Sequence, residues 1–185
     1  DPDQDQNQNR IWGSEIDTNR IDASLKIGYV FPELSYQSFG FQSAFSHHKQ
    51  KAFYGFRVYD IDHQSVYTNL LFNSIIGNTK NKFKTGISFS YDRYLETVDT
   101  FYFNRSDHSV GSFFEYSYDS LENFSLVGGI RVDIHNRLGT FITPRLHLRY
   151  LPQENIILRF SVGSGRKAAN IFAENQTLFG TNRRI

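Results

Sequence analysis

The chain alternates apolar and polar residues with a period of two over most of its length, from Arg20 onward. In the first such stretch the odd positions from Ile21 to Tyr29 are apolar, and the positions between them are mostly polar or glycine. Successive side chains of a β-strand point to opposite faces, so this period is typical of a strand with one apolar and one polar face. The same pattern returns along the chain and predicts about eight strands of roughly ten residues, the length of a tilted strand that crosses a bilayer.

The segments between the predicted strands alternate between short and long. Short turns are predicted at residues 31–34, 77–80, 119–123 and 151–154, where Gly, Pro, Asn and Asp gather. Longer, more polar segments are expected to be loops at residues 47–64, 96–108 and 136–143. The chain is thus expected to leave the sheet for longer at one end than at the other.

Two architectures fit this pattern. A soluble antiparallel sandwich or barrel buries its apolar face in a core, whereas a transmembrane β-barrel turns that face to lipid. Aromatic residues near the strand ends, such as Tyr29, Tyr91, Tyr118 and Tyr150, suit the girdles of a membrane barrel. Short turns alternating with long loops also match the two sides of an outer membrane. The pattern therefore favours an all-β fold: an antiparallel transmembrane β-barrel segment, with about eight strands of a larger barrel.

Composition narrows the possibilities. The 185 residues are enough for one domain, 16% of them are aromatic, and the mean hydropathy is −0.48 because the second face of each strand is polar. The chain has no cysteine, which excludes disulfides and zinc–thiolate sites. A formal net charge of +1 does not suggest nucleic acid as a partner. The polar opening, DPDQDQNQNR, is expected to be a loop or tail of a piece cut from a longer protein.

The last third of the chain carries a more specific pattern. Residues 141–150 read FITPRLHLRY, and residues 163–175 read GSGRKAANIFAEN. Together they resemble the barrel of a TonB-dependent outer-membrane receptor, in which a T-P-R-L-x-L-R-Y strand precedes G-x-G-x-R-x-P and a stretch rich in Asn, Phe and Glu. The matching residues are Gly163, Gly165, Lys167, Asn170 and Glu174. Lys167 stands where the family usually has Arg and keeps the charge, whereas Ala169 stands where it has Pro. Residues 20–29 and 82–94 resemble strands of Bacteroidetes-type members.

This resemblance implies the middle part of a barrel of on the order of 22 strands, closed by a plug domain elsewhere in the same protein. It implies location in the outer membrane of a Gram-negative bacterium, contact with its lipid, and coupling to the TonB complex. The expected activity is uptake of a scarce nutrient, such as a ferric siderophore, cobalamin or another small-molecule chelate, with no cofactor. In these terms residues 1–19 are a polar loop or extracellular segment, residues 20–165 hold the transmembrane strands with alternating short turns and long loops, and residues 166–185 are an extracellular loop segment.

Cations collect on the polar face and are the first candidate ligand-binding residues. Arg131, Arg145, Arg149 and Arg159 would line the lumen, with Lys26, Lys82 and Lys84. They could attract an anionic chelate, or they could pair with acids of the plug or with Asp92, Glu115 and Asp133.

A second candidate group lies in the expected loop at residues 47–64. It consists of His47, His48, Tyr54, Arg57 and Tyr59. Adjacent histidines of an extended chain point to opposite sides, so His47 and His48 are a poor chelate and no metal site is predicted. The aromatic and charged residues could contact a ligand from outside, as loops on a rigid barrel often do, or could anchor the protein at the interface.

No catalytic residue is predicted, because no nucleophile motif with a base and an orienting group is present. Gly163–Lys167 resembles a phosphate-binding loop but lacks its spacing. Two non-enzymatic alternatives remain open: a small self-contained outer-membrane β-barrel with a structural or adhesive role, and a soluble β-barrel binding module. The soluble module would bury Phe39, Phe83 and Phe114 in its core.

Overall fold

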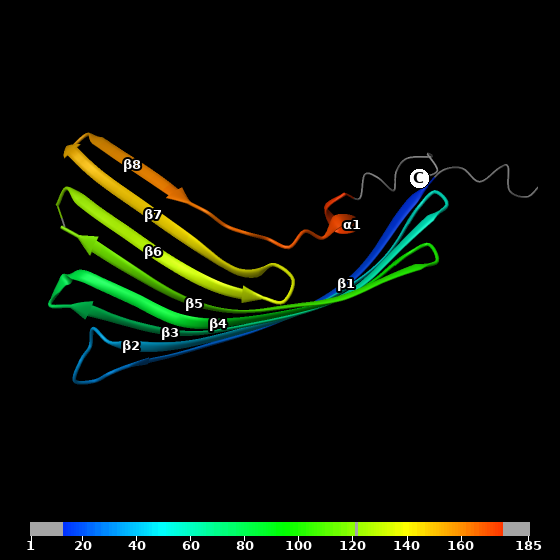
Figure 1. Ribbon diagram of the computed structural model, residues 1–185, viewed down its shortest axis with the longest axis horizontal. Coiled ribbons are helices and arrows are strands. Elements are labelled where there is room, and N and C mark those ends of the chain that lie inside the picture. The colour runs from blue at the N-terminus through cyan, green and yellow to red at the C-terminus, as the bar shows by residue number, and fades with distance from the viewer. Residues whose placement is uncertain (1–12, 121, 176–185) are drawn as a thin grey trace, which may run out of the picture.

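The computed structural model describes residues 13–120 and 122–175. Its strands form one antiparallel sheet in which each strand pairs with the next along the chain, as Figure 1 shows. The strands are β1 (Ser14–Val30), β2 (Ser38–Tyr54), β3 (Arg57–Ile76), β4 (Asn78–Val98), β5 (Phe101–Asp119), β6 (Phe124–His135), β7 (Gly139–Gln153) and β8 (Ile156–Gly163). The predicted all-β, antiparallel fold is confirmed.

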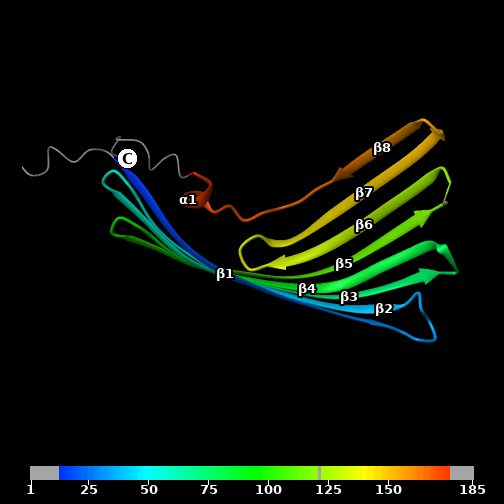
Figure 2. The same cartoon turned by 180° about the vertical axis from the view of Figure 1, so that it is seen from behind.

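One short helix, α1 (Ile171–Glu174), follows the last strand. The sheet is curved, and α1 lies on the side towards which β6, β7 and β8 rise in both views (Figures 1 and 2). We call this side the concave face and the other the convex face. No helix in the described part of the chain is long and apolar enough to cross a membrane.

The two faces differ in chemistry in the way that the period of two predicted. Directly opposed residues on paired strands share a face, so the register assigns each side chain to one side of the sheet. The convex face carries, among others, Ile27, Phe41, Leu70, Ile87, Ile130, Ile142 and Phe160. The concave face carries Ser46, Asn69, Asp92, Glu115, Arg131 and Arg145.

Burial in this sheet is inverted relative to a soluble protein. Among the described residues the buried apolar side chains are those of Ala52, Tyr59 and Ile61 alone. The buried polar residues on the concave face are Asn69, Ser88, Glu96, Asp107 and Asp133. Phe39 and Phe114, which a soluble module would bury, are 51% and 44% exposed. An extensive exposed apolar surface of this kind requires an apolar environment.

The apolar band runs obliquely across the sheet. From Leu25, at the centre of the apolar stretch of β1, directly opposed residues lead through the intervening strands to Thr140 of β7. The apolar stretch of β7 is centred on Leu146, about six residues further along. The centre of the apolar band therefore shifts by about one residue from each strand to the next. With the usual rise per residue and distance between strands, this shift corresponds to a strand tilt of roughly 35°. Transmembrane β-barrels have this tilt.

The prediction of long loops at residues 47–64, 96–108 and 136–143 is wrong, because most of these residues lie in strands. Residues 47–64 belong to β2 and β3, which are joined by a tight turn at Gly55 and Phe56, and Gly55 has the positive φ of 64° that such a turn favours. Residues 96–108 belong to β4 and β5, joined at Asp99 and Thr100. Of residues 136–143, only 136–138 connect strands, because β7 begins at Gly139. Polar side chains extend these strands by pairing across them, as Lys49 does with Asp62 at 3.3 Å.

Each of the four predicted turns corresponds to a short connection, although the bounds differ: residues 31–37, residue 77, the link between Asp119 and Phe124, and residues 154–155. Residues 78–80 and 151–153, which were predicted to belong to turns, lie in β4 and β7. We call this end of the sheet the turn end and the opposite one the extended end. The segment 1–19 is not entirely a loop, since β1 begins at Ser14, while residues 1–12 lie outside the described part. In the segment 166–185 the chain forms α1, and residues 176–185 lie outside the described part.

Candidate lumenal site

Two ion pairs lie in the central part of the concave face, Arg131–Asp133 and Arg145–Glu115. Arg131 Nε and Nη2 donate to the Asp133 carboxylate, with Nη2 and Oδ1 2.6 Å apart, and Nη2 also donates to Ser88 Oγ at 2.6 Å. Arg145 of β7 donates to the Glu115 carboxylate of β5. Two of the predicted lumenal cations are therefore paired with acids of the sheet itself, as one of the two sequence interpretations expected.

Glycines on neighbouring strands make room for these arginines. A Cβ on Gly111 would collide with the side chains of Arg131 and Asp133, and a Cβ on Gly129 would lie 3.1 Å from Arg145 Nε. The long side chains therefore lie flat against the wall instead of projecting from it. The concave face stays hollow although it carries large charged residues.

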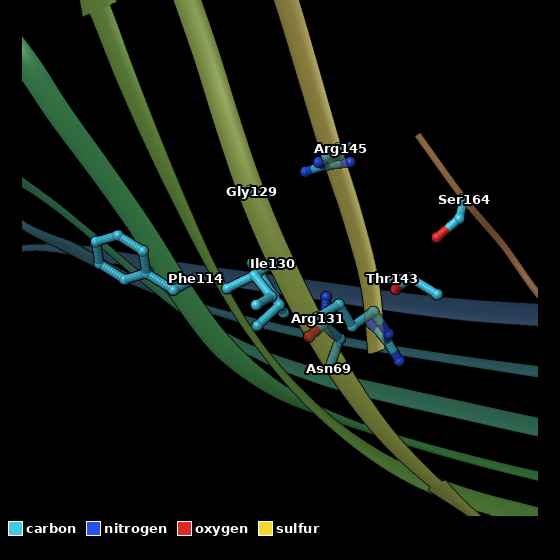
Figure 3. A pocket seen from close by; sticks show the side chains of 9 residues that line it. Asn69, Phe114, Gly129, Ile130, Arg131, Thr143, Arg145 and Ser164 are labelled. Carbon is cyan, nitrogen blue, oxygen red and sulfur yellow. The ribbon is translucent and has the colours of Figure 1, made fainter. Parts of the chain in front are cut away.

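A cavity of about 330 Å³ opens between these side chains (Figure 3). Arg131 of β6 and Thr143 and Arg145 of β7 line it, and Ser164 lies just beyond β8. Asn69 of β3 contributes a side chain that is 9% exposed, and its Oδ1 accepts no hydrogen bond. The wall therefore offers one buried acceptor beside two guanidinium groups whose charges are neutralised.

The remaining predicted cations lie nearer the turn end. Arg149 and Arg159 are directly opposite each other on β7 and β8, and both are exposed on the concave face. Within the described residues neither has a carboxylate partner. Two like charges in this position repel each other, so an anionic group between them would be stabilised.

A second polar cluster covers the concave face towards the extended end. Tyr59 is 1% exposed and donates from its hydroxyl to Glu96 Oε1 at 2.9 Å. His63 bonds to Asp92 Oδ1 at 2.9 Å and stacks on Tyr94 with ring centroids 4.2 Å apart. The Arg105 guanidinium lies 4.1 Å from the centroid of the same Tyr94 ring. We call these six residues the mouth cluster.

The structure separates the two adjacent histidines, as predicted. His47 lies on the convex face, where Nε2 bonds to Asp62 Oδ1 at 2.9 Å, and His48 lies on the concave face opposite His63. In the described parts of the chain no three His, Asp or Glu side chains gather as a metal site would require.

Tyr54 and Arg57 face each other across the β2–β3 hairpin, and Tyr54 packs against the buried Tyr59. Sequence reasoning singled out these three residues but missed Tyr94, Glu96 and Arg105, because it assigned part of this region to a loop. The alternation of β4 continues through Tyr94 and Glu96, and this signal could have placed both on the polar face.

Three of the family-motif residues, Lys167, Asn170 and Glu174, are joined by hydrogen bonds after β8. Lys167 Nζ donates to Glu174 Oε1 at 2.7 Å, and Glu174 N donates to Asn170 O at 3.0 Å in α1. The hydrogen bond from Lys167 holds the pKa of the Glu174 carboxyl below its ordinary value. Gly163 ends β8, where a Cβ would lie 3.3 Å from Pro144 O, and Gly165 lies in open space.

The concave face is thus polar and ion-paired, whereas the convex face is apolar and exposed, as in the wall of a transmembrane β-barrel. A search of curated proteins returned no match. The family described as "TonB dependent receptor-like, beta-barrel" matches residues 1–183. Proteins of that family are receptor and transport barrels of the Gram-negative outer membrane rather than enzymes. The chain therefore belongs to the TonB-dependent receptor-like β-barrel family.

Proposed function

We propose that this chain is the middle part of the barrel of a Bacteroidetes-type TonB-dependent receptor that imports a scarce nutrient chelate. The observation that carries the proposal is the inverted burial, with an exposed apolar convex face and buried carboxylates on the concave face, such as Asp133 paired with Arg131. Lipid suits the convex face, and a water-filled or plugged lumen suits the concave face.

The two edges of the sheet support a larger barrel. Within the described residues β1 pairs only with β2, and β8 pairs only with β7. An exposed edge presents a row of unpaired backbone groups, which cannot remain unpaired in lipid. Further strands of the same protein would pair with both edges and complete the barrel around a plug.

The two ends of the sheet suggest an orientation. The strands β2 to β5 continue beyond the apolar band at the extended end. At the turn end, short connections join the strands close to the edge of this band. Outer-membrane barrels have short turns on the periplasmic side and longer segments outside. The mouth cluster would then face the outer medium, and Arg149 and Arg159 would lie deeper in the lumen, where they would attract an anionic ferric chelate or an acidic group of the plug.

Growth under nutrient limitation tests this function. A strain that lacks the full-length receptor should fail to use one supplied ferric siderophore, or cobalamin, at limiting concentration, and the intact gene should restore growth. Inactivation of the TonB complex should abolish the rescue. Rescue that persists without the complex, or normal growth of the deletion strain on each supplied chelate, would contradict energised uptake of these nutrients.

A further inference from the structure

Glycines hollow out the middle of the concave face. Gly86 of β4, Gly111 of β5 and Gly129 of β6 all lie on this face, on three successive strands. Because glycine has no side chain, the surface recedes there, and the cavity of about 330 Å³ between Arg131 and Arg145 opens beside them (Figure 3). We call it the wall cavity. Small-molecule sites have volumes of about 300–1,000 Å³, so the wall cavity has room for one small ligand.

An aromatic ring forms part of the lining of the wall cavity. Phe113 of β5 lies directly opposite Gly86 on one side and Arg131 on the other. Its ring lies against Gly86, where a Cβ would be 2.9 Å from Cε1 and 3.1 Å from Cζ. The ring therefore rests on the backbone of β4. Because the face of an aromatic ring is electronegative, it attracts the C–H groups of a ligand that lies on it.

The polar groups of the wall cavity favour a ligand that donates hydrogen bonds. Asn69 is 9% exposed, and its Oδ1 accepts no hydrogen bond from the described residues. A buried acceptor without a donor is unfavourable, so a ligand that donates to Oδ1 gains affinity. Thr143 and Ser164 also line the cavity and add hydroxyl groups, which can both donate and accept.

The charges around the wall cavity favour a neutral ligand. Arg131 is paired with Asp133, and Arg145 is paired with Glu115. An anion would lie close to the two carboxylates, and a cation would lie close to the two guanidinium groups. Either would give up its hydration without finding an unpaired counter-charge, and this is costly for an ion.

We propose that the wall cavity binds a small, neutral ring molecule that carries several hydroxyl groups, such as a monosaccharide. One C–H face of the ring packs on Phe113, and one hydroxyl donates to Asn69 Oδ1. The hydroxyl groups of Thr143 and Ser164 bond to other hydroxyls of the ligand. The site requires only that the concave face lines the lumen, so its failure would leave the growth test of chelate uptake unaffected.

Binding of neutral and charged sugars to the purified full-length receptor tests the proposal. D-glucose, D-galactose and D-mannose are titrated in turn and followed by ligand-observed NMR, and at least one of them should bind. D-glucosamine and D-glucuronate have the same kind of ring but carry a charge, and each should bind at least about fivefold more weakly. Binding of none of the three neutral sugars would overturn the proposal, and so would equal binding of a charged one.

Two matched variants locate the bound sugar. Asn69→Leu keeps the size of the side chain but removes the acceptor, and it should weaken binding about tenfold. Gln42 lies directly opposite Asn69 on β2 and does not line the cavity, so Gln42→Leu should leave the affinity unchanged. Equal affinities in these two variants would overturn the proposal.

A third variant blocks the wall cavity without altering a strand. Ser164 lies beyond β8, so Ser164→Trp leaves every strand intact while its bulky side chain fills the cavity. It should abolish sugar binding, and unchanged binding would overturn the proposal. If no sugar binds, and Asn69→Leu lowers the unfolding temperature of the full-length receptor more than Gln42→Leu does, the cavity holds a side chain of the plug instead of a sugar.

Discussion

Arg131 and Asp133 lie on the same face of β6, and Arg131 Nη2 and Asp133 Oδ1, 2.6 Å apart, both occupy the space that a side chain on Gly111 of β5 would need. The ion pair and the glycine are thus parts of one arrangement. Gly111→Ala should displace the pair and lower the free energy of unfolding of the full-length receptor by about 1–3 kcal/mol. Denaturant titration in detergent measures this. Gly128→Ala is the control, because its Cβ would meet Leu146 at an ordinary 3.9 Å, and an equal loss there would refute the explanation.

The Arg131–Asp133 pair itself should be strongly coupled. Asp133 is 5% exposed, so Arg131→Gln leaves a buried carboxylate without its partner and should cost about 2–3 kcal/mol. Asp133→Asn should cost a similar amount. The double variant should cost clearly less than the two single variants together, because it leaves no unpaired charge. Additive losses in this cycle would show that the pair does not act as a unit.

The cost of an arginine on the convex face should depend on how deep in the bilayer the substituted residue lies. Ile87 is 57% exposed in the middle of the apolar band, and Ile87→Arg should destabilise the folded barrel in lipid by about 2–4 kcal/mol. Asn104 of β5 lies on the same face but beyond the apolar band, at the extended end. Asn104→Arg should therefore leave the free energy of unfolding nearly unchanged. Unfolding measured in lipid bilayers separates the two. Equal effects would contradict the placement of the band.

The resistance of residues 164–175, which follow β8, to proteolysis should depend weakly on pH through Glu174. Lys167 lowers the pKa of the Glu174 carboxyl in the folded segment. The ion pair therefore contributes stability above the ordinary carboxyl pKa, and this stability is lost as the pH falls through the lowered value. Limited proteolysis of residues 164–175 should therefore accelerate on acidification below about pH 4. In Glu174→Gln the rate should already be raised at neutral pH and should lack this part of the acceleration. An identical pH profile in both proteins would remove Glu174 from the account.

The period of two was enough to predict the fold, because the membrane imposes it on every strand that crosses. Ile87 and Ile130 are apolar and lie on the convex face, which suits lipid. Their neighbours Ser88 and Arg131 are polar and lie on the concave face, which suits the lumen. The same reasoning failed beyond the band, where water lies on both sides and both faces become polar. Lys49 and Asp62 then look like loop residues, although their cross-strand pair extends the hairpin.

The site was only partly predictable for a related reason. Arg131 and Arg145 could be assigned to the lumen by alternation, and their acids could be named as possible partners. The contact of Phe172 with Tyr59 joins residues that are far apart in sequence, and it depends on how the chain turns after Gly163. Nor does any local pattern reveal that Gly111 lies under an ion pair, since that follows from the register of β5 and β6.

The most direct test of the central claim, that this chain is a wall of an outer-membrane barrel, is electrophoresis of the native protein from fractionated cells. Boiled and unboiled samples are compared with an antibody against residues 13–175. The account predicts a band in the outer-membrane fraction, well above the 21.5 kDa of this chain, whose mobility shifts when boiling unfolds the barrel. A band near 21.5 kDa in the soluble fraction, unchanged by boiling, would contradict it.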